Sequence, residues 1–348
     1  MERVFIKPRS LVSPYLLLML AFVQWLATGC TTHRLSRSKQ KRIDQQVWVI
    51  TGASSGLGRG IALEAGRCKA RVVLAARNRE ALEAVATEIR RYGGEAWVAP
   101  TDVSDTMAVQ LLRSGTVARW KKIDVWVNNA GVTAMGSLWE VPLKDQSRVI
   151  DVNLKDTLYG SYEAIRQFRQ QGYGQLINIV SAESRLPTPY QTGYVAAKAG
   201  IKNMGIALRQ ELRLAGMKAI RIVSVDPWAL NTPIWDHAAS YSGRAPRMGF
   251  MDRTSKAVNA VLHAAASSKN RDIAVGWKTQ AAYFFHHLFP TLAYRISANI
   301  VYKYQVKKAP SMEPSSGNLY QSIPPRQVET DIRQRMKREK AQKRSGVR

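Results

Sequence analysis

Cysteine and acidic residues are both scarce in this chain of 348 residues. The two cysteines are Cys30 and Cys68, so no disulfide framework of the kind that holds small secreted domains together is expected. Aspartate and glutamate number 25 against 52 lysines and arginines, which gives a formal net charge of +27. Such an excess suits an anionic partner, either nucleic acid or the headgroups of a membrane.

The distribution of the basic residues does not favour nucleic acid. They are spread over all segments, without interleaved aromatic residues and without a recognised nucleic-acid-binding module. Residues 333–348 are strongly basic, with Glu339 as the one acidic residue among them. Attraction to anionic lipid headgroups and solvation of a disordered tail are the two interpretations of this stretch, and no nucleic-acid partner is expected.

A glycine-rich turn follows a short apolar run. Residues 47–51 read Val-Trp-Val-Ile-Thr, which is typical of a buried parallel strand, and Gly52, Gly56 and Gly58 come next, before a helical pattern. A strand, a glycine turn and a helix N-terminus form a site for a pyrophosphate, because the backbone can approach the ligand and free N–H groups face it. The spacing differs from the common GxGxxG pattern, so a plain tight turn is the alternative.

Arg77 follows the second expected strand, residues 71–76, and precedes an expected helix over 79–92. Many nicotinamide sites place a carboxylate here against the ribose 2′-hydroxyl, whereas this chain has Ala76 and then Arg77. A guanidinium matches the geometry of a 2′-phosphate, so NADP(H) is favoured over NAD(H). A solvated arginine at a helix start is the alternative interpretation.

Two further strands are expected to end beside the same ligand. The strand over 96–100 leads to Asp102, which can accept a hydrogen bond from an adenine amine or cap the next helix. The strand over 123–127 runs into the sequence Asn-Asn-Ala-Gly at 128–131. Those residues are small and polar, as a backbone that passes close to a cofactor requires.

Tyr194 and Lys198 are four residues apart, and Ser181 lies thirteen residues before the tyrosine. At this spacing the two side chains share one face of a helix, so the ammonium can favour the phenolate and lower a pKa that is ordinarily about 10. The serine hydroxyl can hold a carbonyl or alcohol oxygen beside the tyrosine. Taken alone, however, such a pair is most often ordinary helix surface.

Together these motifs resemble the short-chain dehydrogenase/reductase family over residues 45–276. The resemblance rests on the order and spacing of the glycine turn, the 128–131 sequence, Asn153, Ser181 and the Tyr194–Lys198 pair. It implies one catalytic domain with a doubly wound Rossmann α/β fold and a parallel sheet of seven strands. Family members are often dimers or tetramers through the helices that carry Asn153 and Tyr194, so a homo-oligomer is implied as well.

The resemblance also implies an enzyme that exchanges a hydride with nicotinamide C4 and acts on CH–OH groups. Tyr194 would pass the proton, Lys198 would lower the pKa of the tyrosine, Ser181 would orient the substrate oxygen and Asn153 would hold a water. No metal is expected. The expected cofactor-binding residues are Gly52, Ser54, Ser55, Gly56, Leu57, Gly58, Arg77, Asp102, Val103, Asn129, Ala130, Gly131, Tyr194, Lys198, Pro227 and Thr232.

Trp228 departs from the family pattern. After the strand over 220–225 the family usually reads Pro-Gly, but this chain has Pro227 followed by Trp228. The indole is expected to narrow or close the substrate side, or to line it with an aromatic wall, while Thr232 can still reach the nicotinamide carboxamide. Two functions follow: an active oxidoreductase of a lipophilic alcohol or ketone, or a silent NADP(H)-binding scaffold or redox sensor at a membrane.

The N-terminal segments are expected to associate the protein with a membrane. Residues 1–10 form a basic flank, 11–29 are uncharged and mostly apolar, and 30–44 form a basic linker. Nineteen helical residues span about 28 Å, close to the ~30 Å hydrocarbon core. An anchor, a cleaved signal and a lipoprotein signal ending at Cys30 are the three interpretations. For an anchor, the heavier basic flank after it keeps the catalytic domain in the cytoplasm.

Two segments are expected beyond the catalytic domain. Residues 277–308 carry aromatic residues at helical spacing and form a lid over the substrate cleft, a membrane-interface element, or a helix that packs on the core. Residues 309–348 are rich in proline and serine and then basic, so a disordered tail is expected.

Overall fold

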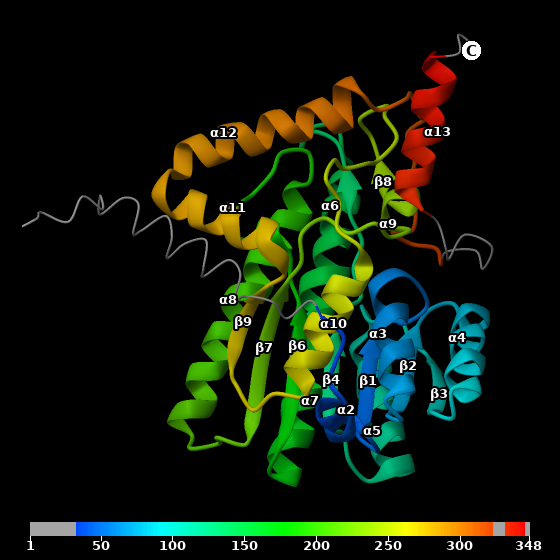
Figure 1. Cartoon of the computed structure of the whole chain (residues 1–348), viewed down its shortest axis with the longest axis vertical. Helices are drawn as coiled ribbons and strands as arrows, with labels where there is room; N and C mark the ends of the chain where they lie inside the picture. Colours follow the sequence, from blue (N-terminus) through cyan, green and yellow to red (C-terminus); the bar gives the residue numbers. More distant parts are fainter. Residues whose placement is uncertain (1–32, 323–330, 345–348) are drawn as a thin grey trace, which may run out of the picture. The chain divides into compact units, whose positions relative to one another are not determined.

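A parallel sheet of seven strands carries the fold (Figure 1). The computed structural model describes residues 33–322 and 331–344. In spatial order the strands are β3 (Glu95–Pro100), β2 (Arg71–Ala76), β1 (Val47–Thr51), β4 (Val125–Asn128), β6 (Gly174–Ile179), β7 (Ile220–Asp226) and β9 (Arg271–Ala274). Every neighbouring pair is parallel. The predicted doubly wound α/β fold with seven strands is therefore confirmed, and the strand order reverses between β1 and β4.

Helices cover both faces of this sheet. One face packs against α3 (Gly56–Arg67), α4 (Arg79–Arg91) and α10 (Thr254–Ala265), and the other against α5 (Thr106–Trp120), α7 (Asp156–Gln171) and α8 (Thr192–Leu214). All five residues of β1 are buried, because a parallel strand covered on both faces exposes neither side. Apolar side chains from both faces form two separate cores, and the polar ends of the strands are left for a site.

A π-helical turn contains Asn153. It spans Asp151–Lys155 and joins α6 (Leu143–Ile150) to α7. Single π-turns inside α-helices are frequent at functional sites, because the extra residue turns one side chain away from its regular position. Here the turn leaves Asn153 buried at the carboxyl ends of the strands.

Two short strands bring the loops after β4 and β7 together. β5 (Ala134–Met135) pairs in parallel with β8 (Ala239–Ser240), which follows the short helix α9 (Ile234–His237). The pairing fixes the chain on both sides of the region where the central strands end. The two loops are therefore held next to each other beyond the central sheet.

The segment over 277–308 forms two helices at the carboxyl-end edge of the sheet (Figure 1). They are α11 (Gly276–Leu288) and α12 (Pro290–Val301), followed by a π-helical turn, Tyr302–Lys307. Pro290 begins the second helix, as proline does at a first helical position, where no backbone N–H is needed. Ala293 and Val301 of α12 are buried, so the helix packs on the domain.

The described part of residues 309–348 is ordered, in contrast to the predicted disordered tail. Ser311 and Ser315 form isolated antiparallel bridges with Arg244 and Ser240, and the Leu319 side chain is fully buried. A last helix, α13 (Ile332–Arg344), buries Ile332. Buried apolar side chains and polar contacts such as the Arg247–Glu339 ion pair together hold segments whose composition indicates a tail.

The N-terminal expectations for 1–10 and 11–29 lie outside the described residues. Within the expected basic linker, Arg37–Ile43 forms helix α2, whose Ile43 is buried in the core. Among the helices that the structure describes, none has the length and apolar character needed to cross a membrane.

Candidate active site

One cavity of about 570 Å³ lies where the central strands end. Ligands of open α/β sheets bind at this edge, beside the point where the strand order reverses, and the volume is typical of small-molecule sites. Every site residue that the sequence predicts lines this cavity, from the glycine turn to Lys198 and Thr232. Their roles remain predictions, but the fold brings all of them to one place.

The glycine turn has the geometry that a dinucleotide needs. Gly52 and Gly56 have φ values of +65° and +52°, in the left-handed region that glycine tolerates best. A Cβ on Gly58 would lie 2.2 Å from the carbonyl oxygen of Gly52, so only glycine fits there. No side chain caps the N-terminus of α3, which leaves its first N–H groups to an anion. These features fit a nicotinamide dinucleotide.

The ends of β1 and β4 are tied together beneath this turn. The Thr51 hydroxyl accepts hydrogen bonds from the backbone N–H groups of Asn129 and Ala130, both at 3.0 Å. The Asn129 side chain donates in return to the carbonyl of Thr51 at 2.9 Å. The predicted small, polar sequence after β4 therefore holds two strand ends in register at the floor of the cavity.

Arg77 lies at the far end of the cavity, against the C-terminal segment. Its Nη2 donates hydrogen bonds of 2.8 Å to the backbone carbonyls of Asn318 and Gln321. Burial lowers the pKa of the guanidinium, although the nearby Asp102 opposes this effect. The alternative of a solvated arginine is therefore wrong, and the donors expected to face a 2′-phosphate point at carbonyl oxygens instead.

Asp102 holds a turn in this region. Its Oδ1 accepts from the backbone N–H of Ser104 at 3.0 Å and from the Ser104 hydroxyl at 2.7 Å. Its other oxygen lies 3.3 Å from Arg148, whose Nε donates to the carbonyl of Leu319 at 3.0 Å. The alternative that Asp102 caps the next helix is wrong, because Asp105 caps α5 by accepting from a backbone N–H of its first turn. The Asp102 carboxylate instead holds the turn before that helix, and it still lines the cavity.

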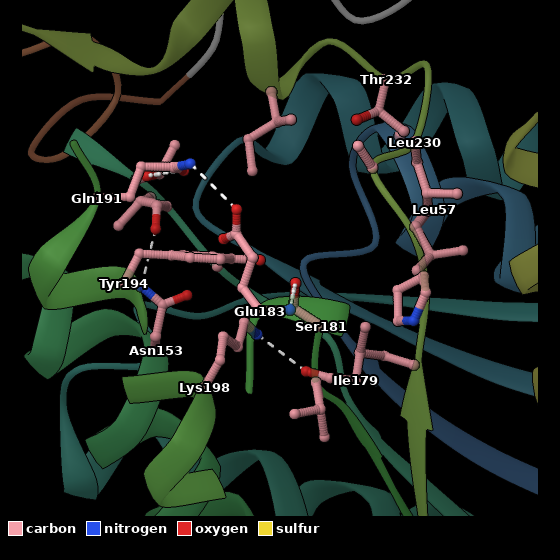
Figure 2. Close-up of a pocket in the computed structure, with 18 of the residues that line it drawn as sticks. Leu57, Asn153, Ile179, Ser181, Glu183, Gln191, Tyr194, Lys198, Leu230 and Thr232 are labelled. Carbon is pink, nitrogen blue, oxygen red and sulfur yellow. Dashed lines mark hydrogen bonds between the residues drawn. The ribbon is translucent and has the colours of Figure 1, made fainter. Parts of the chain in front are cut away.

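Tyr194 and Lys198 lie on one face of α8, as their spacing predicts, and both line the cavity (Figure 2). Lys198 Nζ is 5.6 Å from the centre of the tyrosine ring and donates to the carbonyl of Ile179 at 2.9 Å. The predicted lowering of the tyrosine pKa by Lys198 is not found. Burial raises the pKa of Tyr194 and the charge of Glu183 adds to this, while a hydrogen bond from Ser181 opposes them.

Lys198 is itself shifted by its surroundings. Burial lowers the pKa of its ammonium to about 8, and the nearby Asp156 carboxylate partly offsets this. Asp156 is fully buried, and neither of its oxygens has a hydrogen-bond partner among the described residues. A lysine with a pKa so close to neutrality is sensitive to small changes in its environment.

Asn153 reaches the cavity from the π-helical turn. Its Nδ2 donates to the carbonyls of Val132 and Val149 at 2.8 and 2.7 Å. Its Oδ1 is buried and has no hydrogen-bond partner within the described parts of the chain. A Cβ on Gly131 would come within 2.8 Å of that oxygen, so glycine leaves the acceptor accessible. The amide is fixed by two bonds and keeps one acceptor for a water or ligand.

Ser181 stands two residues after the end of β6, and a network that sequence analysis missed supports it. The Tyr283 hydroxyl of α11 lies 3.4 Å from the Ser181 carbonyl and 3.0 Å from Asp226. Asp226 forms a buried ion pair of 2.5 Å with Lys202, which also contacts Asp272 at 3.0 Å. No sequence motif indicates this network, because its members come from α8, β7, β9 and α11.

Trp228 lines the cavity without filling it. Its Nε1 is buried and has no hydrogen-bond partner among the described residues. The substrate side next to it is mostly apolar, with side chains from α9, the loop after it, α11 and α12: Ile234, Trp235, Met248, Phe285, Ile296 and Ile300. The predicted aromatic wall is thus present. Helices α11 and α12 border the cavity, in the position expected of a lid.

Comparison with known proteins identifies relatives of this chain. The model of the short chain dehydrogenase family matches residues 46–241. The protein named "Uncharacterized oxidoreductase YxnA" from Bacillus subtilis (strain 168) is 31% identical over 287 residues, which cover 82% of this chain and 80% of the relative. The similarity to this relative therefore covers more of the chain than the residues that the family model matches.

Solved structures share the fold. A metagenomic short-chain oxidoreductase in complex with NADP is 29% identical, with a TM-score of 0.58, and the match covers 68% of this chain and 98% of that protein. A 7α-hydroxysteroid dehydrogenase complexed with NADH and 7-oxo glycochenodeoxycholic acid is 23% identical, with a TM-score of 0.60 and coverage of 70% and 97%. The second likeness shows the fold alone.

Proposed function

The chain belongs to the short-chain dehydrogenase/reductase family of NAD(P)-dependent oxidoreductases, and we propose that it uses NADP(H) to interconvert an alcohol and a carbonyl on a lipophilic small molecule. The observation that carries this proposal is the meeting of Ser181, Tyr194 and Lys198 with the glycine turn at one cavity. The bound nicotinamide supplies or accepts the hydride. The protein must orient the reacting oxygen and move its proton.

Three side chains are assigned to these tasks. The Ser181 hydroxyl donates to the substrate oxygen, and the Tyr194 phenol gives that oxygen its proton as a general acid. Burial raises the pKa of Tyr194, so the phenol keeps its proton at neutral pH, which supports reduction of a carbonyl. The Lys198 ammonium lies beside the ring and stabilises the phenolate that remains after the transfer.

The preference for NADP(H) rests on Arg77. No carboxylate stands at the end of β2 to repel a 2′-phosphate, and the guanidinium lines the cavity. A relative at 29% identity is solved with NADP, which agrees with this assignment. Arg77 donates to the carbonyl oxygens of Asn318 and Gln321. A bound 2′-phosphate would have to share the guanidinium with these oxygens or displace them.

A lipophilic substrate suits the lining of the cavity. The residues that α9, α11 and α12 contribute to the lining are mainly aliphatic and aromatic. Apolar surface removed from water stabilises a complex by about 25 cal/mol per Å², so an aliphatic or ring-based body would bind there strongly. A small polar alcohol would leave this lining without contacts.

The C-terminal helices also support a membrane-associated enzyme. Trp277 and Phe289 are 60% and 53% exposed, and the sequence over 273–312 contains no acidic residue. Its exposed basic residues are Arg295, Lys303, Lys307 and Lys308. Exposed aromatic side chains next to positive charge are typical of surfaces that contact anionic lipid.

Vesicle binding tests the membrane contact. The full chain should sediment with vesicles of phosphatidylcholine and phosphatidylglycerol more than with phosphatidylcholine alone. Replacing Trp277 and Phe289 by serine should reduce this difference, whereas serine at the exposed Leu111 and Leu214 serves as the matched control. Equal effects of the two double variants would contradict a contact through α11 and α12.

Turnover tests the enzymatic proposal. Oxidation of NADPH should be followed with methyl ketones of four to twelve carbons, and kcat/KM should rise with chain length. A protein that binds NADPH and reduces none of them would instead be the silent scaffold or redox sensor. A marked preference for the shortest ketone would contradict the lipophilic substrate.

A further inference from the structure

Glu183 introduces a carboxyl group into the substrate side of the cavity. It belongs to the short 3-10 turn Ala182–Ser184, directly after Ser181, and its side chain lines the cavity. Figure 2 shows it reaching from this turn past the Tyr194 ring towards Gln191. An ionisable group that is largely removed from water needs partners.

Only one of its two oxygens has such partners. Oε1 accepts from the Thr188 hydroxyl at 2.7 Å and from Gln191 Nε2 at 3.4 Å. Gln191 is oriented in turn, because its Oε1 accepts from the Thr133 hydroxyl at 3.0 Å. These bonds use one carboxyl oxygen to hold the loop that leads to α8. They leave Oε2 without a donor among the residues that the structure describes.

No basic side chain compensates this carboxyl group. Within the described chain it forms no salt bridge, and the nearby Lys198 donates to the Ile179 carbonyl. Burial raises the pKa of Glu183 to about 7. Because the side chain is partly buried and borders the cavity, a donor for Oε2 can come from a bound molecule.

The position of Glu183 restricts where that donor lies. Its backbone N–H donates to the Ser181 hydroxyl oxygen at 3.2 Å, so the two side chains leave the same short turn. A molecule whose reacting oxygen sits at Ser181 and Tyr194 therefore presents its neighbouring carbons to Glu183. Oε2 would accept from a hydroxyl on one of those carbons.

We propose that Glu183 is a specificity-determining residue, and that it selects substrates with a second hydroxyl beside the reacting carbon. The substrate class is an α-hydroxyketone or the corresponding vicinal diol with a lipophilic body. A neutral hydroxyl fits better than an ammonium group, because the cationic Lys198 lines the same cavity. The assignment of a substrate class rests on the proposed oxidoreductase function.

Matched ketones test this assignment. Reduction of 1-hydroxydecan-2-one and of decan-2-one should be compared with NADPH, using the full chain. The expected kcat/KM for the hydroxyketone is about tenfold higher or more, the size of a hydrogen bond to a charged group. Glu183→Gln should lower the ratio of the two kcat/KM values about tenfold. This ratio is the readout, because the Glu183 charge also acts on the pKa of Tyr194 and its loss changes both rates.

A control distinguishes binding of the substrate hydroxyl by Glu183 from its contacts that hold the loop before α8. Glutamine keeps an oxygen for Thr188, and Glu140→Gln removes an exposed carboxylate from another loop, so neither change should disturb the fold. Equal rates with the two ketones in the wild type would overturn the proposal. It would also be overturned if Glu183→Gln lowered both rates equally, because that is the result expected from a residue that only holds the loop.

A binding measurement keeps this inference separate from the proposed function. Calorimetry of the protein with NADP⁺ should show tighter binding of decane-1,2-diol than of decan-2-ol, and Glu183→Gln should abolish the difference. If no ketone is reduced, the proposed function fails, but this difference still supports the role of Glu183. Equal binding of the two alcohols would contradict that role whether or not the ketones react.

Discussion

Arg77 Nη2 donates a hydrogen bond of 2.8 Å to the backbone carbonyl of Asn318, a residue 241 positions later in the chain. The C-terminal segment thereby covers the side chain that the sequence assigns to a 2′-phosphate. Leu319 anchors the segment, because its side chain is fully buried in a cluster with Val103 and Val132. Cofactor recognition and the order of the C-terminal segment are therefore expected to depend on each other.

Replacing Arg77 by alanine should weaken NADPH binding far more than NADH binding. A hydrogen bond to a charged group contributes about 1.5–3 kcal/mol, so the Kd for NADPH should rise about tenfold or more. Titration of each cofactor by fluorescence measures both constants. Arg79→Ala, at an exposed arginine two residues away, is the matched control. An equal loss of affinity for NADPH and NADH would show that Arg77 does not bind the 2′-phosphate.

Leu319→Ala should loosen the C-terminal segment and tighten NADPH binding. The substitution leaves a cavity at a buried site, so residues 311–322 should exchange their amide hydrogens faster. Freed carbonyl oxygens would then compete less with the 2′-phosphate for Arg77. Hydrogen exchange and the Kd for NADPH are the two measurements. Weaker NADPH binding would mean that the segment completes the cofactor site.

Lys202→Met should destabilise the protein by about 3–5 kcal/mol. Lys202 and Asp226 are 4% and 1% exposed, and removal of the lysine leaves a buried carboxylate with too few partners. Urea unfolding at pH 7 measures the loss, and Lys218→Met on the exposed surface should stay within about 0.5 kcal/mol of the wild type. If Lys202→Met lowered the free energy of unfolding as little as the control does, the Lys202–Asp226 ion pair would not stabilise the protein.

Glu183→Gln should increase the free energy of unfolding over that of the wild type, and this gain should be larger at pH 8 than at pH 5. The pKa of Glu183 rises from 4.5 to about 7 on folding, so the folded state binds more protons between these values and the wild type loses stability as pH rises. The shift corresponds to at most about 3 kcal/mol, and glutamine removes it. Urea unfolding of both proteins at the two pH values measures the difference. A gain that is the same at pH 5 and pH 8 would contradict this assignment.

Much of the site could be predicted from sequence because it depends on local order. The glycine turn and the Tyr194–Lys198 pair each occupy one strand end or one helix turn, and a parallel sheet brings its strand ends to one edge. The expected bounds of the strands before Gly52 and Arg77 agree with β1 and β2. These features could be predicted because their residues are close in the sequence and regularly spaced.

The remainder depends on contacts between distant segments. The contact of Arg77 with Asn318, and that of Tyr283 with Asp226, join residues whose spacing carries no pattern. Burial and the charge of Glu183 raise the pKa of Tyr194. The spacing of Tyr194 and Lys198 in the sequence indicates neither of these effects. Composition likewise indicated a tail at 309–348, where backbone bridges to distant loops and the buried Leu319 hold the described residues.

Tyr194→Phe tests the catalytic centre most directly. Turnover of the best ketone with NADPH should be compared in the wild type and in this variant, together with the Kd for NADPH. Loss of the hydroxyl removes the general acid, so kcat should fall by about 10²-fold or more, while the Kd should change by less than about threefold. A variant that keeps its turnover with unchanged NADPH binding would contradict the assignment of Tyr194 as the proton donor.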